Sequence, residues 1–167
     1  MTTDTLRPQS GQPLPAFTLP AVVQTGDGFD EVTLSNASFA GRVWVLFFYP
    51  KDATSGCTIE VCSFRDRYAE FEKLGVTIVG VSRDKLSAHR RFIENQTLPY
   101  PLASDKGAAL MQSWGLLKQG TMYGKPVTKV ARTTLVVDEE GMVRRVFENV
   151  TPAGHAAQVL EFVKTIV

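Results

Sequence analysis

Apolar residues in this chain occur in two alternating kinds of segment. Residues 43–49 and 76–81 are short, continuous runs rich in β-branched and aromatic side chains, which is typical of strands that are buried on both faces. Residues 61–71 instead carry apolar side chains at helical spacing and are followed by Gly75, a residue that often ends a helix. This strand–helix–strand order predicts a partly parallel sheet that is covered by helices.

Two pairs of shorter apolar segments predict hairpins at the two ends of the chain. Residues 17–19 and 32–34 flank a stretch that contains glycine and aspartate, and we interpret them as a hairpin with a longer loop. Residues 133–137 and 143–147 bracket the turn sequence Asp-Glu-Glu-Gly and predict a second hairpin. Since a hairpin is antiparallel, the second one would make the sheet mixed.

The remaining patterned segments complete an α/β order. A helix that ends near Gln96 could be capped by Ser82 or Asp84, and Thr151-Pro152 has the residue types of a further helix start. Shorter segments predict a strand over residues 101–104 and a helix over 108–114, and apolar positions from 156 to 167 predict a closing helix. The fold class that we expect is α/β, a thioredoxin-like fold with a mixed central β-sheet flanked by helices, although other α/β sheets share the pattern.

The domain organisation that we expect is simple. The polar, Thr- and Pro-containing residues 1–13 predict a flexible N-terminal lead-in, and residues 14–167 have the length of one domain. The first residues lack the basic and apolar regions of a signal peptide, and the longest apolar run is too short to span a bilayer. We therefore expect a cytoplasmic protein.

Charge and metal-ligand composition exclude several classes of function. Eighteen Lys and Arg residues face 17 Asp and Glu residues, a formal net charge of +1, so no single-sign field is available to attract nucleic acid or a membrane surface. His89 and His155, which we expect on helix surfaces, lie far from each other and from the cysteines in sequence, unlike the ligands of a structural zinc site. We expect no metal and no other cofactor.

The two cysteines, Cys57 and Cys62, carry the most specific chemical signal. They lie in a segment between a predicted buried strand and a predicted helix, and reactive sites of such sheets gather beyond the carboxyl ends of the strands. Thr54 or Ser55 could cap the helix. Cys57 would then occupy the first turn, where the helix dipole favours an anion such as a thiolate. Glu60 would be a carboxylate favoured by the same dipole.

The spacing of the two cysteines restricts how they can react. Five residues of intact helix place the Cα atoms of Cys57 and Cys62 roughly 8–9 Å apart on different faces. A disulfide usually requires them within about 7 Å. If the two bond, the first turns of the helix must unwind, which predicts a cycle with two conformations.

The motifs around the cysteines resemble the peroxiredoxins, and specifically the PrxQ or bacterioferritin-comigratory class. Pro50, Thr54 and Cys57 match the pattern Pro-x-x-x-Thr-x-x-Cys, and residues 48–52 and 62–66 read Phe-Tyr-Pro-Lys-Asp and Cys-Ser-Phe-Arg-Asp as in that class. The likeness covers roughly residues 14–167 and includes Trp114-Gly115, Tyr123-Gly124-Lys125 and Arg132-Thr133-Thr134-Leu135. Ser55 departs from the family, which often has Pro at this position.

The resemblance implies a thiol-dependent peroxidase with assigned residue roles. Cys57 would attack hydrogen peroxide or an organic hydroperoxide and become a sulfenic acid, and Cys62 would form an intramolecular disulfide with it. Thr54 would hydrogen-bond the thiolate and the peroxide, Arg132 would stabilise developing charge, and Pro50 would shield the pocket. Thioredoxin or a similar dithiol protein would reduce the disulfide. We expect a monomer, with a weak dimer as the alternative.

Two other functions use the same residues. A thioredoxin-like disulfide oxidoreductase requires two cysteines separated by two residues, whereas four residues separate Cys57 from Cys62. A redox-responsive binding protein or chaperone could use the same conformational switch without turning over peroxide.

Overall fold

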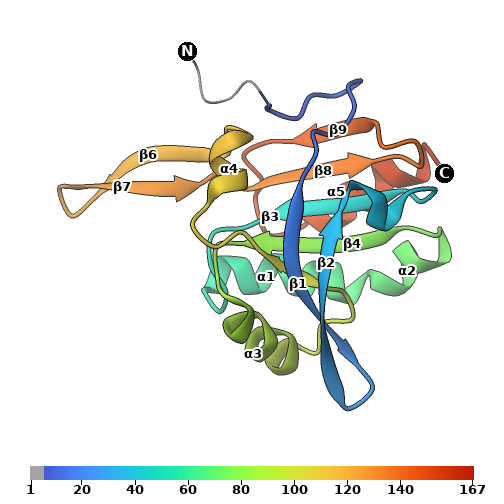
Figure 1. Ribbon diagram of the computed structural model, residues 1–167, viewed down its shortest axis with the longest axis horizontal. Coiled ribbons are helices and arrows are strands. Elements are labelled where there is room, and N and C mark those ends of the chain that lie inside the picture. The colour runs from blue at the N-terminus through green and yellow to red at the C-terminus, as the bar shows by residue number, and fades with distance from the viewer. Residues whose placement is uncertain (1–5) are drawn as a thin grey trace.

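A seven-stranded mixed sheet forms the centre of the molecule, in the order β2-β1-β5-β4-β3-β8-β9 (Figure 1). The computed structural model describes residues 6–167. The strands of this sheet are β1 (Thr18–Thr25), β2 (Gly28–Ser35), β3 (Trp44–Phe48), β4 (Thr77–Ser82), β5 (Leu102–Ser104), β8 (Thr133–Val137) and β9 (Val143–Phe147). A separate two-stranded sheet is formed by β6 (Leu117–Met122) and β7 (Lys125–Val130). The helices are η1 (Asn36–Phe39), α1 (Ser55–Asp66), α2 (Tyr68–Lys73), α3 (Leu86–Gln96), α4 (Ala109–Ser113) and α5 (His155–Lys164).

The central strand β3 joins both hydrophobic layers of the protein. It pairs in parallel with β4 and antiparallel with β8, and all five of its residues are buried. Because side chains alternate along a strand, Val45 and Phe47 pack with Phe64 of α1 in one cluster. Trp44 and Phe48 belong to a second cluster on the opposite face, which includes residues of α4. The predicted mixed α/β sheet flanked by helices is confirmed.

Most predicted strands and helices are present, with three differences in where helices begin or end. Residues 61–71 do not form one helix, because the backbone turns at Arg67 between α1 and α2. The last helix begins at His155 and not at Thr151-Pro152, since Gly154 at its N-cap adopts a left-handed φ of 77°. Lys85 occupies the N-cap position of α3, where we expected Ser82 or Asp84.

The hairpin formed by β6 and β7 was not predicted from the sequence. Its strands pair antiparallel from Leu117–Val130 to Met122–Lys125, and it projects from the body of the molecule at the left of Figure 1. Most of its side chains are exposed and polar. The pairing of the two arms continues at the base of the hairpin, where Ala131 N–H donates to the carbonyl of Leu116 over 2.7 Å.

The described part of the predicted lead-in lies against the strand β9. Gly11 N–H donates to the carbonyl of Val143 over 2.7 Å, and Pro13 forms an isolated bridge with Met142. Residues 1–5 of the lead-in lie outside the described residues. Among the described residues, no helix has the length and apolar character that a membrane span requires.

Candidate active site

Cys57 is fully buried in the first turn of α1, directly beyond the carboxyl end of β3. Thr54 occupies the N-cap position, and its carbonyl accepts the first helical hydrogen bond from Thr58 N–H at 2.9 Å. The positive end of the helix dipole therefore lies close to the Cys57 sulfur.

Arg132, which is distant in sequence, contacts the same sulfur. Its Nη2 donates to Sγ of Cys57 over 3.3 Å. Arg132 lies between β7 and β8, and its own carbonyl accepts from Val150 N–H at 3.1 Å. The β6–β7 hairpin and the start of β8 thus place a fixed positive charge beside a cysteine that is 75 positions away in sequence.

Gly56 leaves the space that the arginine needs. A Cβ atom at this position would lie 2.9 Å from Nη2 of Arg132, closer than non-bonded carbon and nitrogen atoms approach. The sequence gives no signal for this role of Gly56, since a glycine in the first turn of a helix is unremarkable without knowledge of Arg132.

Glu60 lies on the buried face of α1 and binds the other nitrogen of the guanidinium. Nη1 of Arg132 donates to Oε1 of Glu60 over 2.8 Å, and the Glu60 side chain is fully buried. Oε2 has no hydrogen-bond partner among the described residues. Burial raises the pKa of Glu60 to about 7, against the opposing charge and hydrogen bond of Arg132. Glu60 is therefore a partner of Arg132 and more than a carboxylate near a helix dipole.

Thr54 and Pro50, both predicted site residues, lie in the loop that leads to Cys57. The Thr54 hydroxyl donates to the carbonyl of Lys51 over 2.9 Å and makes no capping hydrogen bond. Lys51 N–H in turn donates to Sγ of Cys57 over 3.5 Å. Pro50 is half-buried at the start of this loop. The fold thus brings the loop, the arginine and the cysteine of the predicted site together.

A buried polar network under this loop was not predicted from the sequence. The Tyr49 hydroxyl donates to Oδ1 of Asp52 over 2.6 Å, and Oδ2 of Asp52 lies 2.7 Å from Nδ1 of His89. Nε2 of His89 lies 2.9 Å from the carbonyl of Ala103. The prediction of a surface position for His89 is wrong, because the network holds its ring fully buried. Ala53, the residue after Asp52, adopts a left-handed φ of 63°, which costs an L-residue roughly 1–2 kcal/mol.

His155 is buried as well, which also contradicts the sequence prediction. Its Nε2 lies 2.7 Å from Oγ1 of Thr134, and its ring packs edge-on against Phe64 and Phe147. Burial lowers the pKa of His155 to about 4, and the hydrogen bond with Gln158 opposes this shift. The histidine is therefore a neutral core residue near pH 7.

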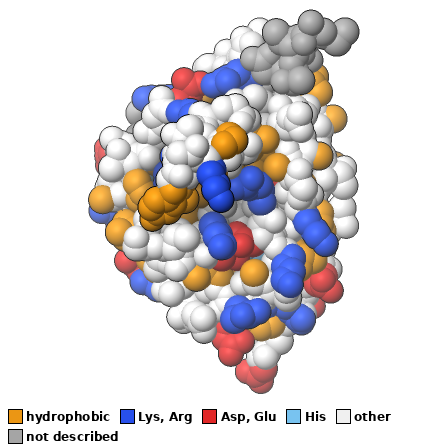
Figure 2. All heavy atoms as spheres, turned by 90° about the vertical axis from the view of Figure 1, so that its left-hand side faces the viewer, with side chains coloured by type: hydrophobic (Ala, Val, Ile, Leu, Met, Phe, Trp, Pro, Cys, Tyr) orange, Lys and Arg blue, Asp and Glu red, His pale blue; other side chains and the backbone are white. Residues whose placement is uncertain are grey.

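The edge of the sheet around Cys57 presents positive charge outward. The parallel strands β3, β4 and β5 are each followed by one basic and one acidic residue. The acids make inward hydrogen bonds to backbone or buried groups; they are Asp52, Asp84 and Asp105. The bases form no ion pair with any described residue; they are Lys51, Arg83 and Lys106. Figure 2 shows Lys and Arg side chains gathered on the face towards which β3 and β4 run.

Cys62 lies five residues further along α1, about one and a half turns, and is half-buried. Its Sγ donates to Oε1 of Gln96 over 3.2 Å. Cys57 and Cys62 are both free thiols on one unbroken helix, so their Cα atoms are roughly 8–9 Å apart by helix geometry. Within residues 6–167, no three His, Cys, Asp or Glu side chains come together as metal ligands.

Comparisons of the sequence with known proteins agree with this geometry. The model of the AhpC/TSA family matches residues 10–146. A Coxiella burnetii protein named as a peroxiredoxin, bcp, is 39% identical over 150 residues, which cover 90% of this chain and 95% of that protein. Peroxiredoxin Bcp of Xanthomonas campestris is 39% identical over 152 residues and covers 91% and 92% of the two chains.

Solved structures of the same class share the fold. A cysteine-to-serine variant of Xanthomonas campestris Peroxiredoxin Q superimposes with a TM-score of 0.79 at 37% identity, covering 90% of this chain and 92% of that one. A PrxQ variant from Xylella fastidiosa gives a TM-score of 0.84 at 27% identity, covering 96% and 98%. The cysteines replaced one at a time in the Xanthomonas protein are far more widely spaced than Cys57 and Cys62.

The family match spans most of the chain, and the relatives cover nearly its whole length at well over 30% identity. The buried cysteine, the arginine beside it and the thioredoxin-like sheet are consistent with both results. This chain therefore belongs to the AhpC/TSA family and, within it, to the peroxiredoxins of the Bcp and PrxQ class, which are thiol-dependent peroxidases.

Proposed function

We propose that Cys57 attacks hydrogen peroxide and organic hydroperoxides, and that Cys62 then converts the product to an intramolecular disulfide. The observation that carries this proposal is the contact between Nη2 of Arg132 and Sγ of Cys57 at 3.3 Å. A guanidinium at this distance, together with a helix N-terminus, stabilises the thiolate that acts as the nucleophile.

In the first step the Cys57 thiolate attacks the nearer peroxide oxygen. The S–O bond forms, the O–O bond breaks, and the leaving oxygen takes a proton to depart as water or an alcohol, which leaves a sulfenic acid. Arg132 stabilises the negative charge that grows on the oxygens. The Thr54 hydroxyl donates its only proton to the Lys51 carbonyl. Its oxygen can therefore accept a hydrogen bond from the O–H group of the hydroperoxide. Pro50 shields the sulfur from water.

In the second step Cys62 attacks the sulfur of the Cys57 sulfenic acid. The S–S bond forms, the S–O bond breaks, and the hydroxyl leaves as water after it takes a proton. Both cysteines lie on α1, so the first turns of this helix must unwind before the two sulfurs meet. The wider spacing of the replaced cysteines in the Xanthomonas protein makes the resolving role of Cys62 a property to be tested in this chain.

The wider context of the reaction is part of the same proposal. Thioredoxin or a similar dithiol protein reduces the disulfide, and the catalytic unit is a monomer formed by residues 14–167, preceded by the lead-in 1–13. We place the protein in the cytoplasm. Organic hydroperoxides are included because structures of the Xanthomonas campestris bacterioferritin comigratory protein concern its alkyl peroxide reduction activity.

Coupled turnover assays test this function directly. Peroxide consumption is followed with NADPH, thioredoxin reductase and thioredoxin, first with hydrogen peroxide and then with cumene hydroperoxide. Cys57→Ser should abolish turnover with both substrates. Residual thioredoxin-dependent turnover in this variant would overturn the assignment of the nucleophile.

A further inference from the structure

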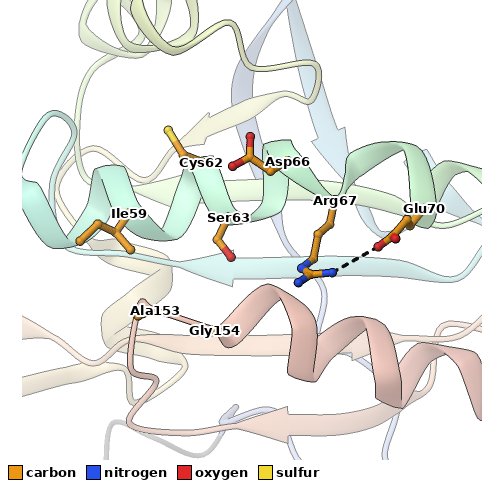
Figure 3. A pocket seen from close by; sticks show the side chains of 8 residues that line it. All are labelled: Ile59, Cys62, Ser63, Asp66, Arg67, Glu70, Ala153 and Gly154. Atoms are coloured by element: carbon orange, nitrogen blue, oxygen red, sulfur yellow. Dashed lines mark hydrogen bonds and ion pairs between the residues drawn. The ribbon is translucent and has the colours of Figure 1, made fainter.

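The thiol of Cys62 faces helix α3 and is held there. Its Sγ donates to Oε1 of Gln96, the last residue of α3, over 3.2 Å. In Figure 3 the Cys62 side chain points away from Ala153 and Gly154, which lie across an open pocket of about 600 Å³ beside α1. The contact with Gln96 therefore competes with any movement of this thiol towards Cys57.

Two further bonds join α1 to the same segment. Nη1 of Arg65 donates to the backbone carbonyl of Gln96 over 2.8 Å. The buried hydroxyl of Tyr100 donates to the carbonyl of Val61 over 2.6 Å. These bonds hold the helical turn around Cys62, which must unwind when the disulfide forms.

The contact with Gln96 also selects a protonation state. An amide oxygen only accepts hydrogen bonds. In this arrangement Oε1 of Gln96 therefore binds the protonated thiol of Cys62, because the thiolate has no proton to donate. The thiolate is the form that attacks sulfur. Burial raises the pKa of Cys62, Arg65 lowers it and Asp66 raises it again. Tyr100 is a further titratable neighbour, and its hydroxyl proton is donated to the carbonyl of Val61.

We propose that Gln96 is a positioning residue that keeps Cys62 as a thiol on folded α1, and so sets how long the Cys57 sulfenic acid persists. This inference rests on the proposed function, in which Cys62 resolves that sulfenic acid. While Gln96 holds Cys62, a second hydroperoxide can oxidise the sulfenic acid to a sulfinic acid, with cleavage of its O–O bond and release of water or an alcohol. Gln96 therefore controls the partition between disulfide and over-oxidation.

Two substitutions of Gln96 separate this role from a merely structural one. Gln96→Met keeps the length of the side chain and removes the amide acceptor, whereas Gln96→Glu keeps an acceptor and adds negative charge near the thiol. Single-turnover reactions with excess hydrogen peroxide are quenched with acid and analysed by intact mass. Disulfide lowers the mass by about 2 units and sulfinic acid raises it by about 32 units.

The two variants should change the second step in opposite directions. Gln96→Met should form the disulfide roughly three- to tenfold faster and give less sulfinic acid. Gln96→Glu should form it more slowly, give more sulfinic acid, and shift the pH profile of disulfide formation to higher pH. The rate of the first oxidation step should be the same in both variants.

Asn95→Met is the matched control, because Asn95 is an exposed neighbour on the same helix; both of its rates should equal those of the wild type. Disulfide formation at the wild-type rate in Gln96→Met, or rates that change in the same direction in both Gln96 variants, would overturn the inference. A wild type that consumes peroxide without forming any disulfide would instead overturn the proposed resolving step, and this inference with it.

Discussion

A Cβ atom on Gly56 would lie 2.9 Å from Nη2 of Arg132, the nitrogen that donates to the Cys57 sulfur. The atom that it would meet is the end of a long, flexible side chain, and a small shift of Nη2 relieves the clash while Nη1 keeps its hydrogen bond to Glu60. That shift, however, weakens the contact of Arg132 with Cys57. The glycine therefore matters for reactivity more than for stability.

Gly56→Ala should lower the second-order rate constant for oxidation of Cys57 by about tenfold, the size expected when one charge-assisted hydrogen bond is weakened. Its midpoint of urea unfolding should stay close to that of the wild type. Stopped-flow measurement with hydrogen peroxide gives the rate constant.

Gly28→Ala is the control for this substitution, because a Cβ atom at Gly28 would meet nothing within 4 Å and Gly28 is remote from Cys57 in the fold. Wild-type reactivity in Gly56→Ala would show that Arg132 does not need the space that Gly56 leaves.

The raised pKa of Glu60 makes part of the stability depend on pH. The ordinary pKa is 4.5 and the folded value is about 7, so the folded protein binds the proton more tightly than the unfolded chain does. The resulting stabilisation is complete below pH 4.5 and is lost as the pH rises through 7. Relative to Glu60→Gln, which does not titrate there, the wild type should lose about 3 kcal/mol of unfolding free energy across this interval.

Urea unfolding of both proteins at pH 5 and at pH 8 measures this difference, and the other titrating groups cancel in the comparison. A difference that is constant with pH, or one that grows in favour of the wild type at pH 8, would mean that Glu60 is already ionised at pH 5.

Asp52 anchors the loop that contains Lys51, whose N–H donates to the sulfur of Cys57. It binds Tyr49 and His89 in the buried network, and removal of one partner of a buried pair typically costs about 3–5 kcal/mol. Asp52→Ala should therefore lower the free energy of unfolding by roughly this amount, measured by urea titration. Asp66→Ala, which removes an exposed carboxylate from α1, should change it by less than about 1 kcal/mol. Equal effects of the two substitutions would contradict the anchoring role.

Disulfide formation should open helix α1. The hydrogen bond of Tyr100 to Val61 and the bonds to Gln96 hold this helix in the reduced protein, and the two cysteines cannot bond across intact helical turns. Amide exchange across residues 55–65 should therefore become faster after oxidation, while β3 and β4 keep their protection. An oxidised, disulfide-bonded protein with unchanged exchange in α1 would contradict this conformational step.

The parts of the fold that the sequence predicted are those in which apolar pattern and burial agree. The strands β3 and β4 come from runs of mainly apolar residues and lie side by side in the middle of the sheet. The β6–β7 hairpin was missed because its exposed side chains carry no period-2 apolar pattern. The break at Arg67 was missed because apolar spacing continues from Phe64 into α2 without a Gly or Pro.

The candidate site was predicted where local motifs define it and missed where distant residues do. Cys57, Thr54 and Pro50 lie within one short segment, and Arg132 came from the family resemblance. Burial of His89 depends on its hydrogen bond with Asp52, 37 positions away. The residues next to His89 in sequence do not indicate that such a distant partner exists. Glu60 had one usable signal, since it lies three residues after Cys57 and so shares the buried face of α1.

The central claim is that Cys57 is oxidised by peroxide and Cys62 resolves it, and intact mass after one equivalent of hydrogen peroxide tests it most directly. The wild type should lose about 2 mass units, and Cys62→Ser should gain about 16, the mass of a sulfenic acid. A wild type that gains oxygen and stops would contradict the resolving role of Cys62. A wild type that does not react within minutes would contradict the peroxidase account as a whole.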